Sequence, residues 1–297
     1  MPSYPIYPPL VTPFTPDDEV DSGALATLIE QLESRGVDGV VPCGTTGEFA
    51  SLDDAEYREV IETTADTATG RVIAGVSDTS VAGVRHRIDV AADAGCDAVL
   101  VTGPYFHAEN AAGGTEAFVE AAVADATLPV YLYNIPVYVG SELAAETVTE
   151  LAASDTVHGI KDTSGNLEYL LGLVRETDDD FEVLCGYDSI LLPALSNGAT
   201  GGINALANVV PELLDAATSA LADGDHETAV TLSQEGIGPL FSQCAAYGFA
   251  PATKAGAAAR GFLDSTAVRP PLVDLTADER ADVADVVDEA LALLDEG

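Results

Sequence analysis

Short apolar runs alternate with longer segments of helical spacing along most of the chain. The apolar runs are rich in valine, isoleucine and leucine, which is typical of buried strands. The segments between them place apolar residues three and four positions apart, as in residues 22–35, which Gly36 ends. The pattern predicts eight strands, at residues 6–11, 37–42, 72–76, 98–102, 130–134, 159–161, 182–185 and 200–204.

The segments after these strands are expected to be helices. Inside the strand-bearing part they cover 22–35, 53–69 with Asp53 as N-cap, 80–94, 114–126, 144–154, 167–176 and 189–196. Eight strand–helix units in about 205 residues are what a closed parallel barrel requires. A doubly wound sheet is the competing fold, but no GxGxxG follows a strand and no GxxxxGK[ST] occurs. We therefore expect an α/β fold, a (β/α)8 TIM barrel.

Beyond residue 206 the strand pattern stops. Helices are expected there at 211–221, 226–247, 251–261 and 277–294. The sequence thus predicts a barrel over residues 1–206 and a helical extension over 207–297 that packs on the barrel.

The net charge of the chain limits the classes of partner that it can bind. It carries 50 Asp and Glu against 11 Lys and Arg, a formal net charge of −39 spread along the whole sequence. Apolar periodicity persists beside 47% hydrophobic residues, so the chain folds and is not a disordered acidic tail. A carboxylate-rich, lysine-poor surface favours work in concentrated salt, and we expect a halophilic protein. The charge argues against nucleic acid and anionic membranes as partners.

Redox and metal chemistry receive no support from the sequence. Four cysteines, Cys43, Cys96, Cys185 and Cys244, lie far apart in apolar surroundings and are expected to be buried free thiols. No zinc-ligand spacing and no histidine cluster occur, so no metal is expected. The N-terminus lacks the pattern of a signal peptide, and no apolar run approaches a membrane span. We expect a soluble, cytoplasmic protein.

The stretch VHGIKDTSGN, residues 157–166, holds the first candidate for chemistry. It combines a short buried strand with a polar turn and places Lys161 at the carboxyl end of the strand. The chain has only two lysines, Lys161 and Lys254. A lysine amine becomes a nucleophile when burial or a nearby cation lowers its pKa, and it then forms Schiff bases with carbonyl substrates. The alternative is a structural lysine that pairs with Asp162.

Other strand ends would surround this lysine, because the carboxyl ends of barrel strands form the active-site face. The sequence GTTGE follows the second strand, and its Thr45, Thr46 and Gly47 suit the binding of a small carboxylate. The alternative is a tight turn capped by threonine. Gly186 follows the seventh strand and would leave room for a small ligand. Ile203 lies on the eighth strand and would form a wall of the ligand site.

Tyr133 ends the strand that precedes the strand of Lys161, so the two side chains are expected to be neighbours. A phenol beside an amine can carry protons to and from a carbinolamine. The alternative is an interior tyrosine whose hydroxyl is satisfied by a backbone carbonyl.

Three motifs taken together, GTTGE, YNIP and GIKDTSGN, resemble those of the dihydrodipicolinate synthase/N-acetylneuraminate lyase family of pyruvate-dependent class I aldolases. The resemblance covers essentially the whole chain, from PPLVTPF near the N-terminus to RPPL at residues 269–272. It implies a (β/α)8 barrel with a helical C-terminal extension, usually assembled as a homotetramer, a dimer of dimers. By motif position it implies that Lys161 forms the Schiff base and Tyr133 relays protons. Thr45 and Thr46 would bind the carboxylate of the 2-oxo acid.

Two positions depart from the dihydrodipicolinate synthase pattern. Such synthases carry an arginine after YNxP for the carboxylate of aspartate semialdehyde, where this chain has Tyr138. They also carry a second relay tyrosine, where this chain has Phe106. A hydroxylated second substrate is favoured instead, with Tyr138, Tyr105, Thr163, Ser164 and Asn204 as its binding residues. We expect retro-aldol cleavage of 2-keto-3-deoxygluconate, or its 6-phosphate, to pyruvate and glyceraldehyde or its phosphate, as in a halophilic archaeal aldolase, without metal or organic cofactor.

Three alternatives stay open at this point. A 2-keto-3-deoxypentonate dehydratase would use the same Lys161 and Tyr133 but expel water. A 4-hydroxy-tetrahydrodipicolinate synthase would need another residue in place of the missing arginine. A non-catalytic sensor of 2-oxo acids would gain no covalent mass at Lys161 when reduced with borohydride in the presence of pyruvate.

Overall fold

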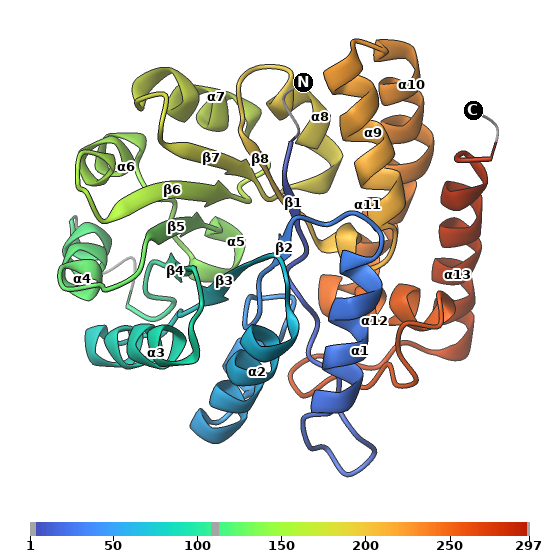
Figure 1. The fold of residues 1–297 in the computed structure, drawn as a ribbon, viewed down its shortest axis with the longest axis horizontal. Helices are drawn as coiled ribbons and strands as arrows, with labels where there is room; N and C mark the ends of the chain where they lie inside the picture. Colours follow the sequence, from blue (N-terminus) through green and yellow to red (C-terminus); the bar gives the residue numbers. More distant parts are fainter. Residues whose placement is uncertain (1–3, 108–112, 296–297) are drawn as a thin grey trace.

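The computed structural model describes residues 4–107 and 113–295. Its centre is an eight-stranded parallel sheet in the order β1-β8-β7-β6-β5-β4-β3-β2, surrounded by helices (Figure 1). The strands are β1 (Ile6–Tyr7), β2 (Gly39–Val40), β3 (Arg71–Gly75), β4 (Ala98–Thr102), β5 (Val130–Asn134), β6 (Val157–Asp162), β7 (Glu182–Cys185) and β8 (Gly201–Ile203). The predicted (β/α)8 barrel is confirmed.

The barrel closes between its first and second strands, where the predicted strands 6–11 and 37–42 are shorter than expected. Pro8 and Pro9 follow β1 and have no N–H to donate, so the regular ladder ends at Tyr7. Their neighbours complete the closure: Val41 donates its N–H to the Pro8 carbonyl, and Leu10 donates to the Val41 carbonyl, both at 2.9 Å.

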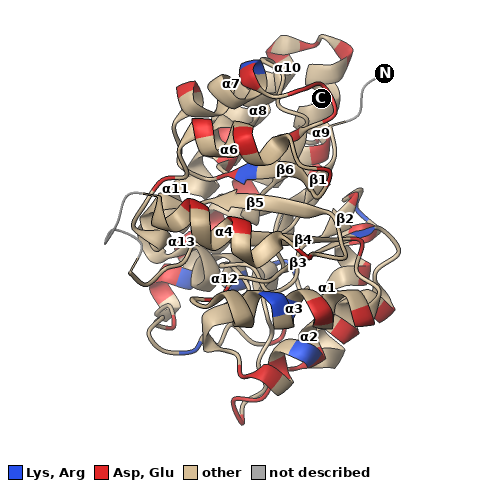
Figure 2. Cartoon of the chain, turned by 90° about the vertical axis from the view of Figure 1, so that its left-hand side faces the viewer, with Lys and Arg blue, Asp and Glu red and all other residues tan. Residues whose placement is uncertain are grey.

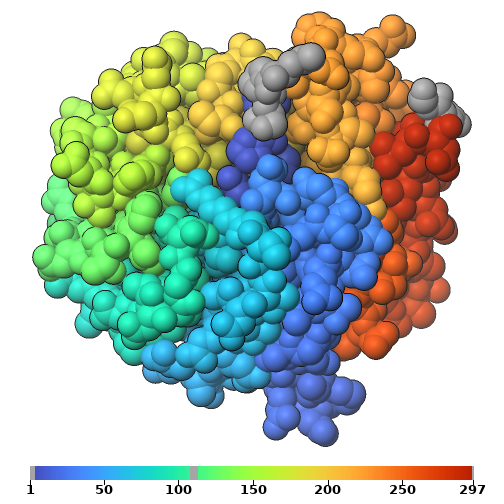
Figure 3. Space-filling model, viewed as in Figure 1, coloured from blue at the N-terminus to red at the C-terminus, as the bar shows by residue number. Residues whose placement is uncertain are grey.

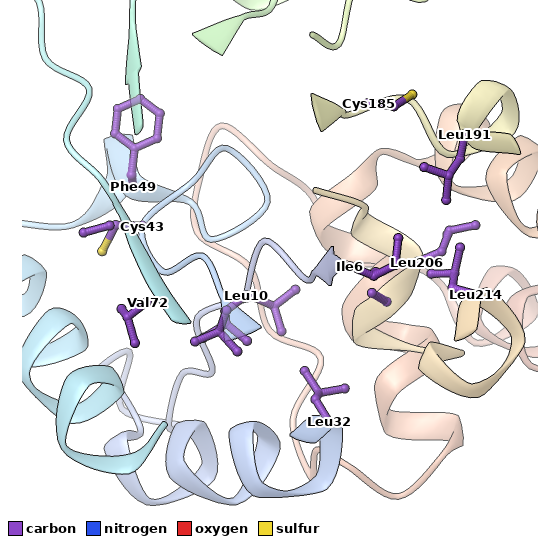
Figure 4. Close-up of a cluster of buried hydrophobic side chains, with 14 of the residues drawn as sticks. Ile6, Leu10, Leu32, Cys43, Phe49, Val72, Cys185, Leu191, Leu206 and Leu214 are labelled. Atoms are coloured by element: carbon purple, nitrogen blue, oxygen red, sulfur yellow. The ribbon is translucent and has the colours of Figure 1, made fainter. Parts of the chain in front are cut away.

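Two apolar layers hold the barrel in shape. The inner layer fills the barrel with one set of strand side chains, such as Leu100, Leu184 and Ile203. The outer layer lies between strands and helices, where Figure 4 shows Leu32 of α1 and Leu191 of α8. Adjacent strand residues face opposite layers, as strand geometry requires. The four cysteines are buried and free, as predicted.

The helices expected around the barrel form, with ends that lie within three residues of the expected bounds. Asp53 caps α2 in a capping box, Ser80 caps α3 and Gly95 ends it in the left-handed conformation. The helices around the barrel are α1 (Ser22–Glu33), α2 (Asp54–Thr67), α3 (Val81–Ala94), α4 (Gly114–Val123), α5 (Pro136–Val139), α6 (Ala145–Ala152), α7 (Leu167–Glu176) and α8 (Leu191–Leu195). The short helix α5 was not expected from the sequence. Short 3-10 turns occupy η1 (Phe49–Ser51), η2 (Asp188–Ile190) and η3 (Ala205–Asn208).

The C-terminal extension contains α9 (Pro211–Asp223), α10 (His226–Thr231), α11 (Gly238–Tyr247), α12 (Phe249–Ala259) and α13 (Ala277–Ala292). The single helix predicted over 226–247 is wrong, because a π-helical turn, η4 (Leu232–Ile237), interrupts it. Pro239 lacks the N–H that a regular helix needs there, and the chain widens before it, with Gly238 donating to Ser233 five residues back. In Figure 3 the extension, orange to red, lies against the blue N-terminal segment.

Acidic residues are spread over the outer helices. Figure 2 shows Asp and Glu on most helices of the face in view, with few Lys and Arg between them. No helix within the described ranges is long and apolar enough to cross a membrane.

Candidate active site

Lys161 and Tyr133 lie side by side at the carboxyl ends of β6 and β5. The two residues are register partners in the parallel pair, and both side chains are buried. Lys161 Nζ donates to Tyr133 Oη at 3.2 Å, and Tyr133 Oη lies 3.1 Å from Thr45 Oγ1. Three strand ends that are far apart in the sequence thus share one hydrogen-bonded chain of amine, phenol and hydroxyl.

The structural alternative for Lys161, pairing with Asp162, does not occur. Asp162 faces the outer side of β6, where it accepts from Asn134 Nδ2 at 2.7 Å and from Ser164 Oγ at 2.9 Å. Burial raises the pKa of Asp162, and these hydrogen bonds oppose the shift. The Lys161 amine is therefore directed into the barrel, while Ser164 is engaged in the turn after β6 and not in the site.

Gly186 lies directly against the lysine. A Cβ built on Gly186 would lie 2.6 Å from Lys161 Cε and 2.2 Å from Thr163 Oγ1, so only glycine leaves space for both side chains. Thr163 Oγ1 is buried and has no hydrogen-bond partner among the described residues. Thr163 and Gly186 therefore lie beside the Lys161 side chain.

The loop of residues 44–48 faces this group from β2. Thr46 and Gly47 are buried, and a Cβ on Gly47 would lie 2.7 Å from the Leu10 carbonyl oxygen, so the loop packs tightly against the segment after β1. Ile203 is fully buried in the inner apolar layer with Tyr133. Thr45 and Ile203 therefore lie at the barrel end that carries the amine, and Thr46 is buried beside Thr45.

Tyr105 and Tyr138 lie farther out. Tyr138 is on α5 and 59% exposed, yet burial of its phenol raises the pKa, and the nearby Tyr133 phenol adds to the shift. Tyr105 is 37% exposed and contacts the ring of Phe49 edge-on, with centroids 5.9 Å apart. Tyr138 thus lies near Tyr133, and Tyr105 lies beside Phe49, which follows the loop of residues 44–48.

Asn204 does not join the site. Its Oδ1 would lie 2.0 Å from a Cβ on Gly202, which would also contact Leu191 of the outer layer. Because Ile203 faces into the barrel, Asn204 faces outward. The prediction that Asn204 binds substrate is therefore wrong.

Sequence reasoning missed two buried charged residues near the site, Asp188 and Lys254. Asp188 follows β7, is 2% exposed and accepts the Leu206 N–H at 2.9 Å. Burial raises its pKa to about 6, although the charge of Lys161 opposes the shift. Lys254 lies behind the loop of residues 44–48, and the scarcity of lysine was the available signal for it. No group of three or more metal-ligating side chains occurs within the described ranges.

Comparison with known protein families and with individual proteins gives matches over most of the chain. The chain matches the dihydrodipicolinate synthetase family over residues 3–290. It is also 41% identical over 234 residues to the 4-hydroxy-tetrahydrodipicolinate synthase of Methanosarcina mazei, an alignment that covers 78% of this chain and 80% of that protein. The chain belongs to the dihydrodipicolinate synthetase family. Enzymes of this family are pyruvate-dependent class I lyases that act through a lysine Schiff base without a cofactor.

Solved structures of the dihydrodipicolinate synthetase family have the same fold. The 4-hydroxy-tetrahydrodipicolinate synthase of Methylacidiphilum fumariolicum SolV superposes with a TM-score of 0.92 at 28% identity, covering 99% of this chain and 97% of that one. A prophage protein of E. coli K12, solved in complex with pyruvate, gives a TM-score of 0.90 at 29% identity, covering 97% and 98%. The fold and the pyruvate-dependent class are thus established for this chain.

Proposed function

We propose that Lys161 forms the Schiff base. The enzyme would either join pyruvate to an aldehyde or cleave such an adduct to pyruvate and the aldehyde. The observation that carries this proposal is the hydrogen-bonded chain from Lys161 through Tyr133 to Thr45 at the carboxyl face of the barrel. Thr45 and Thr46 would hold the carboxylate of the 2-oxo acid, next to the amine that attacks its carbonyl carbon.

The steps follow from these positions and are written in the cleavage direction. Lys161 Nζ attacks the C2 carbonyl, and Tyr133 donates a proton to the carbinolamine hydroxyl, which leaves as water. The resulting iminium ion accepts the electron pair of the C3–C4 bond while the Tyr133 phenolate takes the proton of the C4 hydroxyl. The aldehyde leaves, and Tyr133 passes its proton to C3 of the enamine. Water then attacks the iminium ion and gives a proton back to Tyr133, so that pyruvate is released and the amine is restored.

The names of the relatives support one candidate for the second substrate. The Methanosarcina mazei relative is a 4-hydroxy-tetrahydrodipicolinate synthase, and so is the structural relative from Methylacidiphilum fumariolicum. We therefore propose synthesis from pyruvate and aspartate semialdehyde as the first reaction to test. The carboxylate of the semialdehyde would need a cationic partner.

The side chains of residues 103–107 and 133–140, which we propose to border the site, support a second candidate, cleavage of 2-keto-3-deoxygluconate or its 6-phosphate. Residues 103–107 and 133–140 hold no lysine or arginine, and Tyr138 and Phe106 stand where a synthase would carry a cation and a second relay phenol. The hydroxyls of Tyr138, Tyr105 and Thr163 can donate to and accept from sugar hydroxyls. The uncharged, hydroxylated part of a sugar acid suits these side chains better than a second carboxylate or a phosphate group does.

A substrate panel decides between these candidates. Wild type and Lys161→Ala are assayed in molar KCl with 2-keto-3-deoxygluconate, its 6-phosphate, a 2-keto-3-deoxypentonate, and pyruvate with aspartate semialdehyde. Release of pyruvate and glyceraldehyde assigns the aldolase, consumption of both synthase substrates assigns the synthase, and loss of water without cleavage assigns the dehydratase. Pyruvate trapped on Lys161 by borohydride without turnover of any substrate would exclude the non-catalytic sensor and would mean that the second substrate lies outside this panel. Absence of trapping on wild type would sink the Schiff-base proposal.

Tyr133→Phe tests the proton relay separately. The variant keeps the ring but loses the hydroxyl between Lys161 and Thr45, so kcat should fall about 10²–10⁴-fold, the usual contribution of a positioned acid–base group. Pyruvate trapping should be slower but should reach the wild-type extent. Unchanged kcat would remove Tyr133 from the mechanism.

We also propose that the enzyme assembles as a homotetramer. Tyr105, Phe106, Val137 and Tyr138 are exposed large hydrophobic side chains, Phe106 at 66% and Val137 at 78%. Apolar side chains exposed in this way favour burial against another subunit. Light scattering in molar KCl measures the mass, and a monomer would refute the proposal.

A further inference from the structure

The second lysine of the chain is buried behind the loop that carries Thr45 and Thr46. Lys254 lies on α12 in the C-terminal extension, and its side chain has no exposure. Its Nζ donates to Glu48 Oε1 at 2.5 Å and to the Ala267 carbonyl at 2.6 Å. Burial lowers the pKa of Lys254, and the Glu48 carboxylate opposes the shift. A paired charge of this kind is strongly fixed in place, because moving either partner leaves the other uncompensated.

Glu48 connects this lysine to the loop. It follows Gly47 directly, is 4% exposed and has a left-handed backbone conformation with φ 57°. A residue with a Cβ disfavours that conformation, so outside contacts must hold it. They come from two parts of the C-terminal extension, because Glu48 Oε2 also accepts the backbone N–H of Arg269 at 2.9 Å.

The N-terminal segment completes the support from the same side. The Phe14 ring centroid lies 4.2 Å from Lys254 Nζ and 4.3 Å from Arg269 Cζ, so two cations contact one ring. Thr12 Oγ1 donates to the Gly47 carbonyl at 2.7 Å. The rear of the loop is thus held by both ends of the chain, while Thr45 at its front reaches Tyr133.

We propose that Lys254 is a positioning residue: through Glu48 it sets the backbone of residues 44–48 so that Thr45 and Thr46 can bind the substrate carboxylate. The inference rests on the proposed role of the two threonines. It gives the C-terminal extension an indirect part in substrate binding, although no described residue of the extension hydrogen-bonds to Lys161. Loss of the pair should therefore weaken binding of pyruvate more than it slows the chemistry of bound pyruvate.

The test measures pyruvate trapping as a function of pyruvate concentration in Lys254→Met, Glu48→Gln and the double variant. Borohydride reduction adds mass at Lys161, and peptide mapping confirms the site because the chain has only two lysines. The pyruvate concentration for half-maximal trapping should rise roughly tenfold or more, since small misplacements in a binding site have effects of this size. The extent of trapping at saturating pyruvate should stay at the wild-type level.

The double variant separates positioning from stability. Each single variant leaves one buried charge without its partner and should unfold at lower denaturant, whereas the double variant removes both charges and should recover stability. If the role of the pair is purely structural, the pyruvate concentration for half-maximal trapping returns to the wild-type value in the double variant as stability recovers. A positioning role leaves it raised in the double variant.

Arg260→Gln is the matched control. It breaks an ion pair with Glu212 (2.8 Å) in the same extension, away from the loop of residues 44–48. The half-saturating concentration should stay at the wild-type value even if stability falls. Failure of wild type to trap pyruvate would count against the proposed function, whereas normal half-saturation in the double variant would overturn only the role of Lys254.

Discussion

Close packing at a single residue, Gly186, constrains the position of the Lys161 side chain. Gly186→Ala would place a methyl group 2.6 Å from Lys161 Cε and 2.2 Å from Thr163 Oγ1, inside contact distance of both. The amine must then move, so pyruvate trapping should fall roughly 100-fold, and overpacking should cost about 1–3 kcal/mol of unfolding free energy. Trapping and urea unfolding measure the two effects.

Gly172→Ala provides the control for this substitution. Gly172 lies in α7, and a Cβ there would come no closer than 3.9 Å to the Arg175 side chain. Alanine in a helix should stabilise by up to about 1 kcal/mol and leave trapping unchanged. Wild-type trapping in Gly186→Ala would contradict the tight fit around the lysine.

Asp188 gives the enzyme a pH dependence of stability that its surface charges do not explain. The folded-state pKa of Asp188 is about 6, raised by burial from an ordinary value of 3.8. Above pH 6 the folded protein holds a buried charge that the unfolded chain holds in water, so Asp188 is destabilising there. As pH falls from about 6 toward 3.8, only the folded state takes up the proton, and the penalty disappears.

Asp188→Asn should therefore be more stable than wild type above pH 6, by up to about 3 kcal/mol, because one pKa unit corresponds to about 1.4 kcal/mol. The advantage should vanish near pH 4. Asparagine can still accept the Leu206 N–H through its Oδ1. Urea unfolding of both proteins from pH 4 to 8 at constant KCl measures the difference, and a difference independent of pH would contradict the assignment.

At the residue scale the sequence indicated the amine, the phenol and the threonine loop, because each lies at or just after the carboxyl end of a strand, and barrel geometry brings these strand ends together. The error at Asn204 has a simple cause. Adjacent strand residues face opposite sides, so Ile203 and Asn204 could not both face the substrate. The same alternation excludes the pairing of Lys161 with Asp162. The contact between Lys254 and Glu48 could not be predicted, because it joins residues 206 positions apart.

Helix α13 provides a prediction at the scale of elements. Thr276 caps it in a capping box: Thr276 Oγ1 accepts the Glu279 N–H at 3.3 Å, and Glu279 accepts the Thr276 N–H at 2.7 Å. Thr276→Ala should cost about 1 kcal/mol of unfolding free energy. Thr27→Ala, inside α1, is the control and should be neutral or slightly stabilising. Equal stabilities of the two variants would show that the cap contributes nothing.

Local signals of this kind explain why most elements were predicted well. Residues 98–102, 130–134, 167–176 and 182–185 match the observed elements in full, because polar or glycine-rich boundaries flank clear apolar runs. Proline caused the main differences. It shortened the first strand, began the unexpected helix α5 at Pro136 and interrupted the helix before Pro239.

Charge is the property that belongs to the whole molecule. The accessible surface of 12193 Å² carries a net charge of −39, one charge per about 310 Å², so neighbouring net charges lie roughly 18 Å apart. At 0.01 M salt the Debye length is about 30 Å, and each charge repels several neighbours. At 0.1 M it is about 10 Å, and at 1 M about 3 Å, so repulsion is already weak well below molar salt.

Screening therefore predicts a specific shape for the salt dependence. The melting temperature should rise steeply between 0.01 and about 0.3 M KCl, and an equal ionic strength of tetramethylammonium chloride should give the same rise. If screening alone matters, the curve is flat beyond that point. A continued rise in molar KCl that tetramethylammonium does not reproduce would mean that the acidic surface is stabilised by hydrated potassium ions, which is the stronger form of the halophilic hypothesis. A melting temperature independent of salt from 0.01 M upward would contradict both forms, because a surface with this charge density cannot avoid repulsion at a Debye length longer than its charge spacing.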